Sequence, residues 1–512
     1  MIPKVILLVL FFSVTIGVGL YCRKSVTDVN SFVLGGRAVG PWLTAFAYGT
    51  SYFSAVIFVG YAGQFGWRFG IASTWIGLGN AFLGSLLAWV VLGRRTRVMT
   101  QHLSSSTMPE FFGKRYNSSA LRITASALVF LFLIPYTASL YNGLSRLFGM
   151  AFHVDYSVCV VVMAVLTGIY VIAGGYIATA VNDFIQGIIM LVGIVAVVSA
   201  VLATQGGFMN ALHNLAMVED PAVSSQPGVF ASFFGPDPVG LLGVVILTSL
   251  GTWGLPQMMQ KFYSIKSEKN ISKGTIISTF FAVIVAGGCY YLGGFGRLFS
   301  YKIDPSVTGF DSIIPAMLED LSPFLIGVVV VLVLSASMST LSSLVLTSSS
   351  TLTLDFIKKV RGKKMTDKQQ LLVMRLLIVV FIAISVVIAL VQYKSSVTFI
   401  AQLMSISWGS LAGAFLAPFL FGLYWKRATG AGAWCCFLFA PLFMIANMFF
   451  GGAFPAILRS PINAGALAIL SGLVIMPLVS LFAKPPRKEA VEQIFSCYDE
   501  QVVVSAKKSL KS

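Results

Sequence analysis

The sequence AYGTSYFSAV, residues 47–56, places glycine and hydroxylated residues in the middle of an apolar run that covers 42–66. A second apolar run, 238–260, is interrupted in the same way by SLGTWGLPQ, residues 249–257. Glycine and proline are ordinary in membrane helices, so each interruption alone says little. Their matched spacing, five predicted spans apart, is typical of discontinuous helices in an inverted repeat. We therefore expect two broken helices whose freed carbonyls and half-helix ends can bind a cation and an anionic group.

The rest of the chain is too apolar for a water-soluble protein. Of its 512 residues, 57% are hydrophobic and 10% are charged, whereas soluble domains carry about a quarter charged residues. Apolar runs of about 20 residues recur along the chain, and each is long enough to cross a bilayer as a helix. The sequence therefore predicts an all-α polytopic membrane protein. Its thirteen expected transmembrane helices lie at 4–22, 42–66, 70–92, 120–149, 156–174, 179–203, 238–260, 272–299, 323–354, 371–392, 398–424, 430–450 and 463–483.

The distribution of basic residues predicts the orientation. Loops rich in lysine and arginine, such as 94–97 and 358–364, fall on one side of the predicted membrane, and the long loop 204–237 on the other side has neither residue. The positive-inside rule then places the N-terminus outside and the C-terminus in the cytoplasm of a multi-pass plasma-membrane protein. The net charge of +17 fits this orientation and attraction to anionic lipid better than nucleic-acid binding. Residues 484–512 are expected to form a short, flexible cytoplasmic tail.

Cysteine usage gives no sign of a metal site. The six cysteines show no ligand spacing and fall mostly in apolar runs. We interpret them as small buried hydrophobic residues rather than as metal ligands or disulfide partners.

Polar residues inside the predicted spans mark a candidate site. The single acidic residue is Asp183, in AVNDFIQG at 180–187. A charge within lipid is costly, so Asp183 is a functional candidate, although its place near a helix start also suits an interfacial cap. In the ninth span Ser339, Ser342 and Ser343 share one helix face. Small residues favour close helix packing, but packing alone does not need so many hydroxyls. Hard oxygen ligands with one carboxylate favour sodium over calcium.

Several motifs together resemble the sodium:solute symporter family, whose members carry sugars, proline, pantothenate, sialic acid or monocarboxylates. They are SFVLGGR (31–37), TMPEFF (107–112), AVNDFIQG (180–187), SMSTLSS (337–343) and FGLYWKR (421–427). The resemblance runs from about Phe32 to Ala431 and implies a core with the five-plus-five inverted-repeat fold of the leucine transporter. One transmembrane domain, 1–483, would hold an extra N-terminal helix at 4–22, the repeats at 42–203 and 238–424, and two helices within 430–483, before the tail at 484–512.

The resemblance also implies where ions and solute bind. Backbone carbonyls of Thr50, Phe53 and Ala336 and the hydroxyls of Ser339 and Thr340 would hold a first sodium ion. Some members bind a second sodium ion, for which the matching residues here are Asp183, Ser339, Ser342 and Ser343. The solute candidates between the broken helices are Ser54, Tyr136, Trp253, Gln402 and Ser405. Tyr52 stands where proline carriers have an acidic residue, so the solute does not follow from the family alone.

These features predict a sodium-coupled symporter that imports a small organic solute by alternating access, with one or two coupling sodium ions. A carboxylate or an amino acid is favoured because half-helix dipoles suit a carboxylate, and a sugar comes next. The alternatives are a solute sensor that signals to a partner protein and a channel with the same core. An enzyme is not expected, because the chain has three histidines and no acid–base constellation. The expected partners are the solute and the lipid bilayer. The sequence indicates no nucleic acid and identifies no protein partner.

Overall fold

The computed structural model describes residues 2–152, 154–361, 365–395 and 400–499. The described part consists of helices and loops and contains no β-strand. Its first helices are α1 (Ile2–Cys22), α2 (Val29–Leu34), α3 (Pro41–Tyr52), α4 (Ala62–Phe69), α5 (Thr74–Gly79), α6 (Arg94–His102), α7 (Met108–Arg115), α8 (Ser119–Phe152), α9 (Tyr156–Thr204) and α10 (Phe208–Ala216). The later ones are α11 (Pro238–Gly254), α12 (Pro256–Ser264), α13 (Lys269–Gly293), α14 (Pro305–Thr308), α15 (Ile313–Leu318), α16 (Pro323–Thr351), α17 (Lys358–Arg361), α18 (Asp367–Ser395), α19 (Ile400–Tyr424), α20 (Gly430–Phe450), α21 (Pro461–Phe482) and α22 (Lys488–Phe495).

The all-α membrane fold is confirmed, whereas the count of thirteen spans stays a prediction. Among the described residues, 10 helical stretches are long and apolar enough to cross a membrane, or 11 with the bent pair α11 and α12. Two of these stretches, Val56–His102 and Tyr156–Thr204, have 47 and 49 residues, about 70 Å of helix against a hydrocarbon core of about 30 Å. Each contains a glycine at a positive φ that L side chains rarely adopt, Gly70 at φ 62° and Gly175 at φ 54°. Two crossings within each stretch would give the predicted number.

Both predicted broken helices are present. α3 ends at Tyr52, Phe53 is extended at φ −87° and ψ 123°, and the helix resumes at Ala55 and runs through the π-helical segment η3 (Val56–Tyr61) into α4. α11 ends at Gly254, Leu255 has the same extended backbone at φ −83° and ψ 123°, and α12 continues at an angle of 49°. The carbonyls just before each break lose their helical partners and are free to bind other groups.

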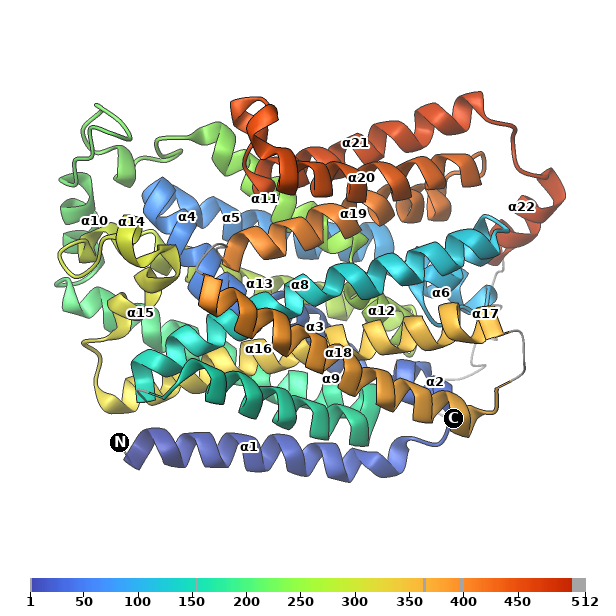
Figure 1. The fold of residues 1–512 in the computed structure, drawn as a ribbon, viewed down its shortest axis with the longest axis horizontal. Helices are drawn as coiled ribbons and strands as arrows, with labels where there is room; N and C mark the ends of the chain where they lie inside the picture. The colour runs from blue at the N-terminus through green and yellow to red at the C-terminus, as the bar shows by residue number, and fades with distance from the viewer. Residues whose placement is uncertain (1, 153, 362–364, 396–399, 500–512) are drawn as a thin grey trace, which may run out of the picture.

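The long helices run side by side, with α16 and α19 inside the bundle and α1 along its edge (Figure 1). Every residue of α16 from Val329 to Thr351 is buried, whereas α1 buries only Phe11, Thr15, Gly19 and Cys22. α10, α14 and α15 gather at one end of the bundle, and the basic segments α6 and α17, together with α22, lie at the other (Figure 1). The bundle therefore has a basic end, as the predicted orientation requires, although the orientation itself stays a prediction.

The tail is more ordered than the sequence suggested. α22 buries Val491 and Phe495, and the Tyr498 hydroxyl donates to the carbonyl oxygen of Arg95 at 3.2 Å. The Arg95 guanidinium also lies 4.5 Å from the centre of the Tyr498 ring. The expectation of a flexible tail is therefore wrong as far as residue 499. Residues 398–399 at the start of the eleventh predicted span, and 500–512 at the end of the tail, lie outside the described residues.

Candidate functional site

Five oxygen atoms from α3 and α16 converge at the first helix break. Thr340 Oγ1 lies 3.2 Å from the carbonyl oxygen of Thr50, 3.3 Å from that of Phe53 and 3.1 Å from that of Ala336. Ser339 Oγ lies 3.0 Å from the oxygen of Thr50 and 2.9 Å from that of Ala336. The structure thus brings together all five residues that the family resemblance assigned to a first sodium ion.

The local sequence explains why these carbonyls are available. The extended backbone at Phe53 ends α3, so the Thr50 and Phe53 carbonyls point toward α16 instead of continuing a helical ladder. The Ala55 amide, at the start of the second half-helix, donates to Ser337 Oγ at 3.2 Å. Gly49 lets α3 approach α13, because a Cβ there would lie 2.4 Å from the Phe281 ring. The break is therefore fixed from both sides by its neighbours.

The chemistry of this set suits a hard monovalent cation. Three carbonyls and two hydroxyls supply neutral oxygens and no formal charge, and hard oxygen ligands select hard cations. A divalent ion would leave two uncompensated charges in a buried site, which is costly.

The second predicted set contains a residue that the sequence analysis missed. Asp183 in α9 and Ser343 in α16 are both buried, and Lys261 of α12 lies between them. Its Nζ is 3.6 Å from Asp183 Oδ2 and 3.0 Å from Ser343 Oγ. Ser343 Oγ also lies 2.7 Å from Ser51 Oγ. The predicted span ended at residue 260, one position short of Lys261, so the lysine was treated as part of a loop.

The remaining members of this set lie on the same face of α16. Ser342 Oγ donates to the carbonyl oxygen of Ser339 at 2.9 Å, and Ser339 Oγ already belongs to the first set. Ser339 therefore connects the two sets. Whether a sodium ion binds the second set stays a prediction.

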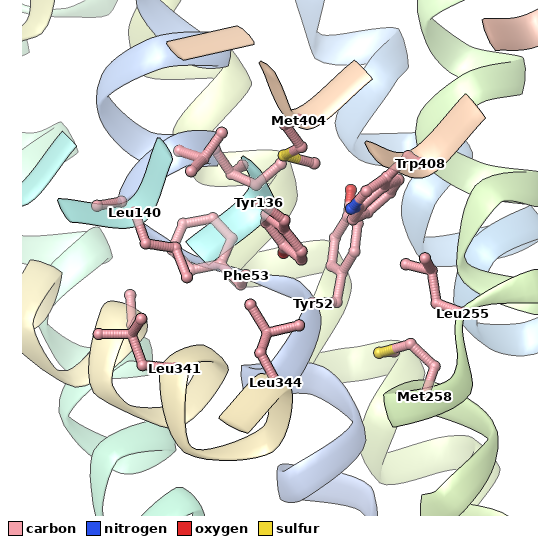
Figure 2. Close-up of a cluster of buried hydrophobic side chains, with 14 of the residues drawn as sticks. Tyr52, Phe53, Tyr136, Leu140, Leu255, Met258, Leu341, Leu344, Met404 and Trp408 are labelled. Carbon is pink, nitrogen blue, oxygen red and sulfur yellow. The ribbon is translucent and has the colours of Figure 1, made fainter. Parts of the chain in front are cut away.

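Beside the first break, aromatic side chains from three elements form a buried cluster (Figure 2). The ring of Trp408 in α19 lies 5.8 Å from that of Tyr52 in α3 and 5.8 Å from that of Tyr136 in α8. Leu255 and Met258, from the second break, lie next to them in Figure 2. Four polar atoms here make no hydrogen bond of normal geometry among the described residues, namely Tyr52 Oη, Ser54 Oγ, Tyr136 Oη and Trp408 Nε1, and the Tyr136 hydroxyl has Ser54 and Trp408 as polar neighbours. Buried polar atoms are normally paired, so this aromatic cluster offers polar contacts to a ligand.

The five predicted solute residues differ in their surroundings. Ser54 and Tyr136 supply two of the unpartnered atoms of the aromatic cluster. Ser405 Oγ lies 2.8 Å from the Tyr61 hydroxyl, and Gln402 is half-buried near the start of α19. The Trp253 indole N–H donates to the carbonyl oxygen of Leu83 at 3.0 Å, so it is not available to a solute in this conformation.

Trp408 is the main residue of the aromatic cluster that the sequence analysis missed. It lies three residues after Ser405, on the same face of α19. That spacing was visible in the sequence, but one aromatic residue in an apolar run looks the same whether it packs or binds.

Comparison with known proteins gives consistent matches over nearly the whole chain. The profile of the sodium:solute symporter family matches residues 32–440. The chain is 27% identical over 491 residues to the osmoregulated proline transporter OpuE of Bacillus subtilis (strain 168), covering 95% of this chain and 96% of that protein. It is 30% identical over 438 residues to the sodium/proline symporter of Staphylococcus aureus (strain JH9), covering 84% and 82%. A solved structure of a sodium-coupled sialic acid symporter superimposes with a TM-score of 0.70 at 16% identity, over 95% of this chain and 99% of that one.

Proposed function

The chain belongs to the sodium:solute symporter family, and on that premise we propose that it imports proline across the plasma membrane together with sodium. As a member of this family it is a multi-pass membrane transporter, not an enzyme, and sodium is its coupling ion. The proposal adds the solute, the binding residues and an orientation with the N-terminus outside. Two proline transporters among its relatives, each matching more than four-fifths of this chain, support the choice of proline.

The observation that carries the proposal is the meeting of the five oxygens with the aromatic cluster at one helix break. The first sodium ion binds the carbonyls of Thr50, Phe53 and Ala336 and the hydroxyls of Ser339 and Thr340. Phe53 and Tyr52 are neighbours in the chain, so the segment that holds the ion also positions one wall of the aromatic cluster.

The aromatic cluster has the chemistry that a small cyclic amino acid needs. The rings of Tyr52, Tyr136 and Trp408 and the side chains of Leu255 and Met258 offer an apolar surface for a pyrrolidine ring (Figure 2). The half-helix that starts at Ala55 directs its positive end toward the break, where it favours a carboxylate. Tyr52 replaces the acidic residue of the proline carriers, so the amino group would bind neutral oxygens such as the Tyr52 and Tyr136 hydroxyls.

Sodium binding and solute binding are coupled because both use the helix break after α3. Sodium binding joins α3 to α16 through the Thr50 and Phe53 carbonyls, which holds the break in the conformation that the solute meets. The ion changes solute affinity only if it binds that conformation more tightly than the alternative one. Ser339, Thr340 and the Ala336 carbonyl belong to α16, whereas the Thr50 and Phe53 carbonyls lie at the C-terminal end of α3. Any relative movement of these two helices therefore takes the ligands apart and supplies the required difference.

Uptake by purified protein in liposomes tests the proposal. The uptake of radiolabelled proline is measured under four conditions. These are equal sodium on both sides of the membrane, an inward sodium gradient, and potassium or lithium gradients of the same size. We expect accumulation above the outside concentration only with a sodium gradient, and competition by unlabelled proline but not by a sugar or sialic acid. Equal uptake with all three cations, or no competition by proline, would contradict it. A solute sensor or a channel would show no accumulation against the gradient.

A further inference from the structure

The second predicted sodium set already holds a cation that belongs to the chain. Lys261 and Asp183 have side chains that are 2% and 0% exposed, so both charges are inside the protein. The Lys261 ammonium meets the Asp183 carboxylate at 3.6 Å and the Ser343 hydroxyl at 3.0 Å. It also lies 5.2 Å from the centre of the Tyr176 ring, within range of a cation–π contact. Carboxylate, hydroxyl and aromatic ring together surround one positive charge.

A sodium ion bound to the same residues would compete with this ammonium. Both cations need the carboxylate of Asp183 and the hydroxyl of Ser343, and a buried ion pair tolerates an extra unpaired charge poorly. With Lys261 alone the pair is neutral, whereas Lys261 and sodium together would leave one net positive charge in the buried bundle. The described residues include no second carboxylate in contact with the pair that could balance it.

We propose that the ammonium group of Lys261 is a tethered cation that occupies the second cation site, so that the native transporter binds one sodium ion per cycle. This disagrees with the two-sodium set implied by the family resemblance, which needs Asp183 and Ser343 to be free for an ion. The Lys261 side chain also links α12, the second half of a broken helix, to α9 and α16. A mobile sodium ion would make the same link only when it is bound.

One feature of the pair leaves room for an exchange of cations. The Asp183 oxygens have no hydrogen-bond partner among the described residues, and neither has the side chain of Gln186, one turn further along α9. The contact between Nζ and Oδ2 is therefore an ion pair without a close hydrogen bond. Shortening Lys261 to alanine removes the ammonium and leaves Asp183, Ser339, Ser342 and Ser343 in place around the vacated volume. The variant should then gain the sodium ion that the sequence predicted.

The test is the number of sodium ions bound at equilibrium by the purified full-length protein in detergent, measured with ²²Na⁺ in the absence of solute. The proposal uses the first sodium site described under the proposed function, but this readout does not depend on proline. We expect one ion in the native protein, two in Lys261→Ala, and one in Lys261→Arg, which keeps the charge. The double variant Lys261→Ala/Asp183→Asn removes both charges and should return to one ion. Two ions in the native protein, or one in a folded Lys261→Ala variant, would overturn the proposal.

A second variant keeps the test decisive where Lys261→Ala fails to fold. Thr340 belongs only to the first set, so Thr340→Val should lower the sodium affinity of an otherwise native chain by about 10- to 150-fold. At a sodium concentration that just saturates the native protein, the variant should therefore bind far less than one ion. Where Lys261→Ala does fold, the combination of the two substitutions should bind a single ion, at the second site. If native protein and Thr340→Val both bind one ion, the first site has been misplaced, which is a failure of the proposed function. Loss of one ion from a native total of two would instead overturn the role of Lys261.

Discussion

Replacing Thr340 with valine removes one hydroxyl from the proposed first sodium site and preserves the shape of the side chain. Thr340 Oγ1 lies between 3.1 and 3.3 Å from three carbonyl oxygens, those of Ala336, Thr50 and Phe53. A hydrogen bond or comparable polar contact to a charged partner contributes about 1.5–3 kcal/mol, and each 1.4 kcal/mol corresponds to about tenfold in affinity. We therefore expect the sodium affinity to fall by about 10- to 150-fold.

The substitution should also lower the free energy of unfolding of the sodium-free protein. The Thr50 oxygen still accepts from Ser339 Oγ at 3.0 Å, while the Phe53 oxygen loses the hydroxyl of Thr340. One buried acceptor without a partner costs about 1–3 kcal/mol, which a bundle of this size tolerates. The variant should thus fold, and its defect should appear as a raised sodium requirement.

Two measurements check this prediction. The sodium concentration for half-maximal solute uptake gives the affinity in the working protein. Thermal unfolding at rising sodium gives it without transport, because a ligand at about 100 times its Kd stabilises the folded state by about 2.7 kcal/mol. Thr351→Val is the matched control, since within the described part of the chain Thr351 Oγ1 bonds only to the Thr347 and Ser348 carbonyls of its own helix. A Thr340→Val variant that stays within twofold of the native sodium requirement would refute the assignment.

Three further predictions follow from single contacts. Trp408→Phe removes an unpartnered indole N–H and should raise the KM for proline about 2- to 10-fold, the contribution of one neutral hydrogen bond. Trp253→Phe should change this KM little, because the Trp253 N–H bonds to the Leu83 carbonyl. Equal effects of the two substitutions in uptake assays would contradict this prediction. Arg122→Met leaves the buried Asp355 without the guanidinium that contacts it at 2.6 Å and should lower the free energy of unfolding by about 3–5 kcal/mol. Arg94→Met, at an exposed ion pair with Glu268, should lower it by less than about 1 kcal/mol. Thermal unfolding measures both variants, and a similar loss of stability in the two would refute the predicted difference. Gly254→Ala puts a Cβ 2.6 Å from the Cα of Ala412 and should destabilise the fold by about 1–3 kcal/mol. Gly17→Ala in α1 meets nothing within 4 Å and should be neutral or slightly stabilising. Unchanged stability in Gly254→Ala would show that α11 and α19 can separate at the break.

The sequence was sufficient for features that repeat along one helix. Ser339, Ser342 and Ser343 were assigned to a cation because hydroxyls recur on one face of an apolar run, and a helical period is visible without any tertiary contact. Thr340 and the carbonyls of the first set followed only from the family resemblance. The two breaks were found because glycine, proline and polar residues interrupt long apolar runs. The actual breaks lie at Phe53 and Leu255, which are not themselves helix breakers. Leu255 directly precedes Pro256, and a proline disfavours the helical conformation of the residue before it, so this break has a local cause. Phe53 has no such neighbour, and its carbonyl contacts Thr340 of α16, so composition alone could not place the break there.

The features that the sequence missed are pairings between distant helices. Lys261 seemed to end a span, because a lysine lowers hydropathy, but the bend of 49° between α11 and α12 turns this residue into the bundle. The hydrogen bond between the Trp253 indole and the Leu83 carbonyl joins residues 170 positions apart, and no local sequence pattern predicts it. The role of Trp408 emerges only once Tyr52 and Tyr136 are placed around it.

A tethered cation also sets an upper limit on how far the transporter can concentrate its solute. With Lys261 in place, the empty sites are neutral, and the form loaded with one sodium ion and a zwitterionic amino acid carries one net charge. Moving that charge inward across 100 mV yields about 2.3 kcal/mol, or about 50-fold accumulation before the sodium gradient itself is added. A transporter with a second sodium ion in place of the lysine would move two charges per cycle and gain the square of that factor. Because the chain carries its own cation, one sodium ion would enter with each proline. The transporter would then reach a lower maximum accumulation ratio but use fewer sodium ions per cycle. Lys261→Ala should therefore move two charges per proline, and the ratio of charge to solute, measured as current and uptake in the same vesicles, separates the two cases. A ratio of one in a folded Lys261→Ala variant that still transports would show that Asp183 does not admit a second ion, and that the lysine is not what excludes it.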